Sequence, residues 1–297
     1  MCYEAEGYEM LGYHEALRET MSMPNPHFPI KMHRTPIRET GVVLFPHHWH
    51  EHLEFLFIES GEAIIECGSV PIEAKPGDLI VVNSNELHYG ISRSSDLAYH
   101  VLIADISLLH SGSVDAAETK FIAPISQNQL LFSNLVRGDA ATVSCMHALI
   151  GELERRDFGY EVAIKSELYR LLALLLRGHV ATVLTKDEHA ERMKNVARFE
   201  PVFRYIAENY QAPLTVEQLS GIAGLSRFHF SRLFKELTGR TVTEYVTAVR
   251  LDKADHLLRS TGLSVTEVAV ESGFNDIYYF SRTFKKHKKV PPSKFRD

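Results

Sequence analysis

The last third of the chain contains one pattern twice. Residues 215–235 read TVEQLSGIAGLSRFHFSRLFK, and residues 264–285 read SVTEVAVESGFNDIYYFSRTFK. The two stretches align at an offset of 49 residues, which becomes 50 after one extra residue near Asp276. Self-similarity at a fixed offset indicates a duplicated supersecondary unit.

Each copy is predicted to form a short helix, a turn around a glycine and a second helix. Thr215 and Ser264 are good N-caps for the first helices, and Ser226 is a good N-cap for the second helix of the first copy. Apolar residues such as Leu219 and Phe230 give the two helices a shared face. The pattern predicts two helix-turn-helix units, although a pair of helical hairpins that docks onto another protein would share it.

The charge of the chain is unevenly distributed. The 297 residues carry a formal net charge of −6, which taken alone argues against a nucleic-acid partner. Residues 196–297, however, hold 16 Lys+Arg against 11 Asp+Glu, a balance of +5, whereas residues 1–195 carry −11. An acidic half joined to a basic half is expected when one domain binds a polyanion, and a solvated basic tail is the alternative.

Polar and basic side chains occupy the opposite face of each second helix. They are Arg227, His229, Ser231, Arg232 and Lys235 in the first copy, and Asp276, Tyr278, Ser281, Arg282, Lys285 and Lys286 in the second. Such side chains can reach base edges and phosphates, and arginine suits the two acceptors of guanine. These faces favour double-stranded DNA as the partner.

Residues 196–297 resemble the C-terminal DNA-binding domain of the AraC/XylS family of bacterial transcription regulators. The matches include Leu233-Phe234-Lys235, Ser272-Gly273-Phe274-Asn275, Tyr279-Phe280-Ser281-Arg282 and Pro292-Ser293, while Lys289 stands where members usually carry glycine. In this family a long helix joins the two units, and Thr241–Leu258 fits it.

The resemblance also implies which residues face DNA. Phe228, Ser231 and Arg232 would face bases from the first unit, and Ile277, Tyr278 and Arg282 from the second. Arg227 and Lys285 complete the expected DNA-binding set. The bulky Tyr278 indicates apolar contact, such as with thymine methyl groups, rather than amide-type reading of adenine.

The first half of the chain has a different pattern. Short apolar runs separated by turn residues predict strands at Val42–Phe45, Leu53–Ile58, Ala63–Cys67, Leu79–Val82 and Ala98–Ile106. Such strands are typical of an antiparallel barrel or sandwich. After residue 140 apolar residues recur at helical spacing, and the leucine-rich stripe from Val162 to Leu176 suits packing on the barrel or a subunit interface.

A histidine-rich segment follows the first predicted strand. Gly41, His48, His50, Glu54 and Gly61 fit G-x6-H-x-H-x3-E-x6-G, and His88 follows a Pro76-Gly77-Asp78 turn. This resembles the two cupin motifs, and the resemblance implies His48, His50, Glu54 and His88 as metal ligands. Alternate strand residues such as His48 and His50 point to one side. Three imidazoles and a carboxylate suit Zn, Mn, Fe or Ni.

Other interpretations of these histidines compete with a metal site. We favour an effector pocket of His48, Trp49, His50, Glu54 and His88 without an essential metal, because regulators of this type keep a histidine remnant that binds an organic effector. Asn83 and Asn85 also depart from the cupin pattern, where proline and glycine are usual. Histidines that are merely hydrogen-bonded in the core are the third interpretation. Trp49 could stack on a sugar or pack in the core.

The predicted fold class is α+β and multidomain. We expect a cupin-like effector-sensing barrel at 1–140, a helical pair that dimerises at 141–180, a linker at 181–195 and a double helix-turn-helix DNA-binding domain at 196–297. The expected function is a DNA-binding transcription regulator controlled by a small-molecule effector, by family analogy a sugar or related metabolite. We expect no catalytic residues and no cofactor. The alternative is a metal-dependent cupin enzyme fused to a DNA-binding domain.

The remaining expectations concern partners and location. We expect a homodimer through the helix at 160–178, promoter DNA and RNA polymerase as partners, and no membrane association. The longest apolar run, Leu171–Leu176, is too short for a span of about 20 residues. Cys2, Cys67 and Cys145 form no CxxC pair, which favours a reducing cytoplasm.

Overall fold

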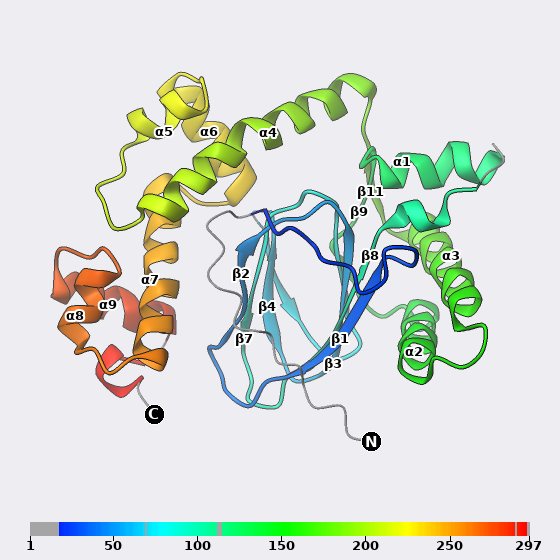
Figure 1. Ribbon diagram of the computed structural model, residues 1–297, viewed down its shortest axis with the longest axis horizontal. Helices are drawn as coiled ribbons and strands as arrows, with labels where there is room; N and C mark the ends of the chain where they lie inside the picture. The colour runs from blue at the N-terminus through cyan, green and yellow to red at the C-terminus, as the bar shows by residue number, and fades with distance from the viewer. Residues whose placement is uncertain (1–17, 69, 112–114, 289, 296–297) are drawn as a thin grey trace. The chain divides into compact units, whose positions relative to one another are not determined.

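The computed structural model describes residues 18–68, 70–111, 115–288 and 290–295. Contacts divide them into two compact units, a strand-rich unit of residues 20–195 and a helical unit formed mainly by residues 196–295 (Figure 1). The predictions that involve Cys2 and Lys289 lie outside the described residues. None of the helices in the described ranges combines the length and the apolar composition that crossing a membrane requires.

Two antiparallel sheets form the strand-rich unit, together with a small third sheet. The five-stranded sheet has the order β1-β8-β3-β6-β10, formed by Ile30–Pro36, Ala98–Ala104, Leu53–Ser60, Leu79–Val82 and Leu135–Val136. The four-stranded sheet has the order β2-β7-β4-β5, formed by Val43–His48, His88–Ser92, Ala63–Cys67 and Val70–Ala74. β11 (Val180–Val183) pairs with β9 (Leu130–Phe132).

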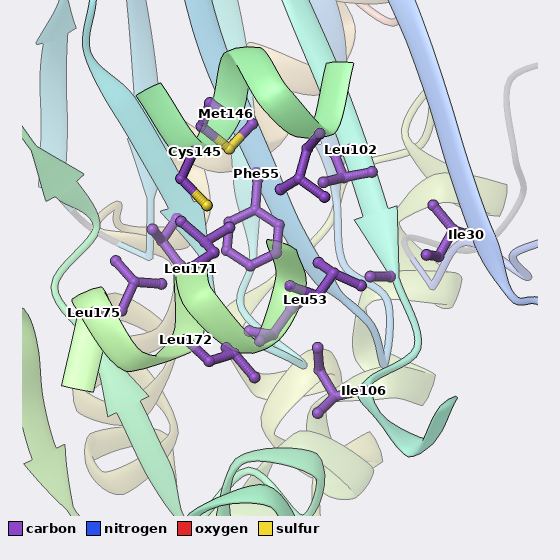
Figure 2. Packing of buried hydrophobic residues seen from close by; sticks show 14 of the residues in the cluster. Ile30, Leu53, Phe55, Leu102, Ile106, Cys145, Met146, Leu171, Leu172 and Leu175 are labelled. Atoms are coloured by element: carbon purple, nitrogen blue, oxygen red, sulfur yellow. The ribbon is translucent and has the colours of Figure 1, made fainter. Parts of the chain in front are cut away.

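Strand β3 is buried on both faces because each face packs on a different layer. Leu56 and Ile58 belong to the core between the two sheets, which also contains Ile65 of β4. Phe55 and Phe57 point the other way, into a core shared with the helices α2 (Ala140–Arg155) and α3 (Tyr160–Gly178) (Figures 1 and 2). Alternation along an extended strand divides the side chains between the layers.

The leucine-rich stripe of α3 packs inside the strand-rich unit. Leu168, Leu171, Leu172 and Leu175 are at most 1% exposed, and Figure 2 shows Leu171 beside Phe55. The leucine excess from which the dimer was predicted is therefore explained by the core of one chain. Dimerisation through residues 160–178 stays a prediction without this support.

Residues 181–195, for which a linker was predicted, have regular structure. They comprise most of β11 and the beginning of α4 (Lys186–Asn209). Thr185 starts this helix, because its hydroxyl accepts a hydrogen bond from the Glu188 N–H, and the Glu188 carboxylate accepts one from the Thr185 N–H. Shorter helical segments lie at Ile106–Leu109, Glu118–Ile122 and α1 (Ala123–Ser126).

The helical unit contains the predicted duplication. After α4 it consists of α5 (Val216–Ile222), α6 (Arg227–Thr238), α7 (Val242–Ser260), α8 (Val265–Glu271), α9 (Ile277–Lys288) and a short 3-10 helix at Pro292–Lys294. Thr215 and Ser264 each form a capping box, and the Ser226 hydroxyl accepts a hydrogen bond from the His229 N–H. The predicted α+β fold class, with antiparallel strands first and helix-turn-helix units last, is confirmed.

Each helix-turn-helix unit has its own aromatic core. Phe230 and Phe234 of α6 pack against Phe199 of α4 with ring centroids 5.4 and 6.1 Å apart. At the equivalent positions of α9, Phe280 and Phe284 pack with Leu258 and Val268. Since these rings are 0% exposed, the duplicated F-x3-F spacing fixes which face of each second helix is buried.

This burial generates a test with an internal control on one helix. Phe230→Ala should lower the free energy of unfolding of the helical unit by about 3–5 kcal/mol, because it removes a fully buried ring and leaves a cavity. Phe228→Ala, two residues earlier at a side chain that is 82% exposed, should change it by about 0.5 kcal/mol or less. Urea denaturation followed by circular dichroism measures both. Equal losses for the two variants would contradict this packing.

Candidate functional site

The second helix of each helix-turn-helix unit presents an exposed face. In α6 the side chains of Arg227, Phe228, Ser231 and Arg232 are all exposed. At 100° per residue these four positions span about 140° of the helix surface, so they form one continuous face. The sequence-predicted residues of the first unit are therefore brought together.

Helix α9 presents the corresponding residues. Tyr278 is 80% exposed, Arg282 and Lys285 are exposed, and Ile277 is half-buried against the core of this unit. The N-terminus of α9 is fixed by Asp276, whose carboxylate accepts hydrogen bonds from the N–H groups of Tyr278 and Tyr279 at 2.7 and 3.0 Å. The aromatic ring of Tyr278 therefore projects from the start of the helix, as Phe228 does from α6.

The arginines of α6 have only weak intramolecular partners. Arg232 donates a hydrogen bond to Glu236 at 3.1 Å, and Arg227 lies 3.8 Å from the Glu217 carboxylate. Exposed ion pairs of this kind contribute about 0–1 kcal/mol, so a phosphate or a guanine edge can replace the carboxylate at low cost.

One of the basic residues near the C-terminus does not belong to this surface. Lys288 is 5% exposed, and its ammonium lies 2.6 Å from the Asp255 carboxylate and 3.6 Å from that of Asp252. Its positive charge is paired with these carboxylates inside the helical unit, and the ion pairs join α9 to α7. The charge count of the sequence does not distinguish this buried lysine from the neighbouring exposed lysines. The sequence signal that could have identified its ion pairs is the pair of aspartates three residues apart on α7.

Helix α7 carries the connection between the two units. Its 19 residues extend about 27 Å at 1.5 Å per residue. Arg250 of this helix donates hydrogen bonds to the carbonyl oxygens of Tyr210 and Ala212 at 2.7 and 3.0 Å. These bonds hold the middle of α7 against the segment that follows α4.

The strand-rich unit brings the predicted histidine cluster together. His48 ends β2, His50 follows it, Glu54 lies in β3 and His88 begins β7. Each residue offers one ligand atom, and all four atoms lie within 4.8 Å of one another. Trp49, which is 6% exposed, is buried but is not part of this group.

The backbone orients each of the three imidazoles. The Nδ1 atoms of His48, His50 and His88 lie 2.8, 3.1 and 2.9 Å from the carbonyl oxygens of Pro46, His52 and Glu86. A carbonyl oxygen can only accept, so each Nδ1 carries the proton. In a neutral ring the lone pair is then on Nε2, the nitrogen that belongs to the cluster.

Glu54 provides the negative charge of the cluster. Its carboxylate is buried, with Oε2 2.7 Å from His50 Nε2 and 3.4 Å from His88 Nε2. Burial alone would raise the pKa of Glu54, but the charge of His88 and the hydrogen bond to His50 outweigh it and hold the pKa well below its usual value. Burial lowers the pKa of His88 to about 4.

The loop before His88 is held by residues that the sequence motifs did not indicate. The Glu86 carboxylate accepts hydrogen bonds from the Asn83 N–H and from the Asn134 side chain at 2.9 and 2.8 Å. Asn85, at the place where cupins usually have glycine, has a positive φ of 58°. Asparagine tolerates this left-handed conformation better than most residues, so the departure from the motif preserves the turn.

Comparison with known proteins assigns both units. A model of the AraC-like ligand binding domain matches residues 41–172, and a model of a helix-turn-helix domain matches residues 219–297. An uncharacterized HTH-type transcriptional regulator of Bacillus subtilis, YdeC, is 22% identical over 94% of this chain and 96% of its own length. The HTH-type transcriptional activator RhaS of an Enterobacter species is 26% identical over 85% of this chain and 87% of its own.

Among solved structures, ToxT from Vibrio cholerae covers 90% of this chain and 97% of its own at 15% identity, with a TM-score of 0.44. The two matched domain models fall on the strand-rich unit and on the helical unit in turn, and the relatives that span most of the chain are HTH-type transcriptional regulators. The chain belongs to the AraC/XylS family of DNA-binding transcription regulators with a ligand-binding domain.

Proposed function

We propose that this regulator reads operator DNA through α6 and α9 and responds to a small molecule bound by its strand-rich unit. The observation that carries the DNA part is the pair of exposed recognition faces, each with an aromatic ring at its start and an arginine one turn later. A helix of about 27 Å between the two units suits successive major grooves about 34 Å apart.

Within these faces the arginines and the aromatic rings have different tasks. The guanidinium groups of Arg232 and Arg282 each offer paired N–H donors that suit O6 and N7 of guanine. Arg227 and Lys285 are placed to neutralise phosphates. Phe228 and Tyr278 offer apolar ring surface to thymine methyl groups, with Ser231 and Ile277 beside them. RNA polymerase is the further macromolecular partner of this function.

The arginine assignment is tested with a control of equal charge. Arg282→Ala and Arg232→Ala should each weaken binding to the operator by about 1–3 kcal/mol and relax base preference at one position, because each removes a bidentate base contact. Arg155→Ala in α2 removes an exposed arginine that pairs with Glu152 at 2.8 Å, so it changes the net charge equally. Fluorescence anisotropy on fragments upstream of candidate target genes measures the affinities. A comparable loss with Arg155→Ala would contradict the assignment.

For the effector, we propose a sugar or related metabolite that contacts the histidine cluster. The imidazoles and the Glu54 carboxylate converge on one another and offer hydrogen-bonding groups to sugar hydroxyls. Trp49, the one tryptophan of the chain, lies between His48 and His50 in sequence and is buried at 6% exposure. Binding requires neither a catalytic step nor a leaving group, so we propose a sensing role and not an enzymatic one. The intracellular compartment that contains the DNA is the proposed location.

Trp49 also provides the readout for this assignment. Because it is the only tryptophan, emission excited at the indole band reports on its surroundings alone. Titration with a panel of sugars and sugar acids should shift or quench this emission for the effector, and the same compound should change operator affinity. No response to any member of the panel, in protein that binds operator normally, would overturn the proposed effector class.

We propose a homodimer in which the exposed side of α3 contributes contacts. The support is apolar surface at the start of this helix, where Phe158 is fully exposed and Val162 is 74% exposed. Phe158→Asp combined with Val162→Asp should convert the dimer to a monomer in analytical ultracentrifugation, because two buried charges would face each other across the symmetry axis. Val183→Asp, at a valine that is 62% exposed in β11, is the control. A dimer that survives the double change refutes this interface.

A further inference from the structure

We propose that the segment at residues 210–212 holds the second helix-turn-helix unit directly against the first, and so restricts the chain to one spacing between the two DNA tracts that it reads. The segment meets Arg250 of α7 together with Glu271 and Gly273 of the second unit, and we call this the interunit contact. The proposal rests on the proposed reading of DNA by α6 and α9. It adds which residues determine the distance and the rotation between these helices.

The segment 210–212 is anchored in the first unit. It follows directly on α4, whose side chains form part of the core beneath α6. Phe199 stacks on Phe230 with ring centroids 5.4 Å apart, and Phe203 lies against Phe234 with ring centroids 5.7 Å apart. A displacement of the segment would therefore disturb the packing that orients α6.

Arg250 attaches α7 to this segment. Its guanidinium donates hydrogen bonds to the Tyr210 carbonyl oxygen at 2.7 Å and to the Ala212 carbonyl oxygen at 3.0 Å. Both carbonyls come just after the C-terminus of α4, where the helix dipole favours a positive charge. Because a planar guanidinium with two acceptors has a fixed direction, the pair of bonds determines orientation as well as distance.

The turn between α8 and α9 contacts the same segment. The Gln211 side chain donates a hydrogen bond to the carbonyl oxygen of Glu271, the last residue of α8, at 2.6 Å. Gly273 has a φ of 86°, and a Cβ at this position would lie 2.8 Å from Gln211 Cα and 3.0 Å from the Tyr210 carbonyl oxygen. Only glycine permits so close an approach at this φ. The two units therefore meet backbone to backbone.

The interunit contact stiffens a connection that α7 alone would leave flexible. The first half of α7 belongs to the first unit, because Tyr245 packs against the rings of Phe203 and Phe234. Leu251 and Leu258, further along the helix, belong to the core of the second unit. A single helix between two packed bodies can bend, and long helices are rarely straight. A direct contact between the bodies resists that bending.

This stiffness has a consequence for the DNA that the chain accepts. One additional base pair between two tracts moves them apart by about 3.4 Å and rotates one against the other by about 34°. Two recognition helices that are held rigidly cannot follow this change, whereas helices joined by α7 alone would follow part of it. The interunit contact is therefore a specificity-determining element that acts without touching a base.

The first experiment measures the penalty for a wrong spacing. The probe is a duplex selected from a random-sequence library by the unaltered full-length chain, with the contacted tracts located by hydroxyl-radical footprinting. One base pair inserted between the tracts should weaken binding by about tenfold or more, because it misplaces a whole tract. In the double variant Gln211→Ala with Arg250→Met, which removes the three hydrogen bonds, this penalty should fall severalfold.

A measurement without DNA separates this proposal from the proposed function. Spin labels at Glu236→Cys in α6 and Lys286→Cys in α9, both exposed positions, report the distance between the helices by double electron–electron resonance. Cys2→Ser avoids a third label, since Cys67 and Cys145 are buried. The distance distribution should be narrow without further changes and broader in the double variant. Equal widths would overturn the proposal, whereas failure of the unaltered chain to select any duplex would count against the proposed function alone.

The matched control is Leu258→Ala. Leu258 is 2% exposed in the core of the second unit, so this change lowers the melting temperature while the hydrogen bonds of the interunit contact stay in place. It should keep the full spacing penalty. Gln211→Ala alone, which removes one exposed hydrogen bond, should reduce the penalty in a chain that still folds. An unchanged penalty in that variant, or an equal reduction in Leu258→Ala, would refute the assignment.

Discussion

Burial of both faces of β3 is the constraint on which the strand-rich unit depends. Phe55 and Phe57 are at most 2% exposed beneath α2 and α3, and Leu56 and Ile58 are at most 1% exposed between the sheets. A slip of one residue in strand register would exchange these two sets and bury each against the wrong layer. Glu54 shares the inward direction of Leu56, so the same packing that fixes the register of β3 directs a carboxylate towards the histidines of β2 and β7.

A comparable constraint operates in the helical unit, where it acts twice. Phe230 with Phe234 and Phe280 with Phe284 are fully buried, and their spacing fixes the rotation of α6 and α9. The exposed faces follow from this rotation, because Phe228 and Arg232, like Tyr278 and Arg282, lie on the sides of the helices that the phenylalanines leave free. Packing therefore positions the exposed side chains that we propose to contact DNA.

Much of this arrangement could be predicted from the sequence, since its causes are local. Serine or threonine caps, glycine turns and the repeated F-x3-F spacing are readable in the chain, and the H-x-H-x3-E spacing places His48, His50 and Glu54 at one end of two strands. The predicted strand Ala63–Cys67 has the observed bounds. These features depend on near neighbours and on backbone periodicity, which a single sequence records.

The features that could not be predicted depend on distant partners. The leucine stripe of α3 is equally apolar whether a sheet or a second subunit covers it, and only the fold shows that Leu171 and Leu175 meet the sheet. The buried side chains of α4 begin at Phe199, and no residue before it in this helix is buried. Because the first half of α4 is polar, its sequence resembled a linker. Glu86 and Asn134 support the loop before His88 from 48 residues apart, a distance that no motif spans.

Two buried charge clusters show how the two units differ. In the helical unit the Lys288 ammonium lies within 3.6 Å of the carboxylates of Asp252 and Asp255, and Arg259 donates a hydrogen bond to Asp255 at 2.8 Å, so cations and carboxylates are matched within the chain. In the strand-rich unit the buried Glu54 faces imidazoles whose second nitrogens already donate to carbonyls. A buried carboxylate without a permanent cation is costly. The first cluster is complete as folded and serves stability, whereas the second is the cluster at which we propose that the effector binds.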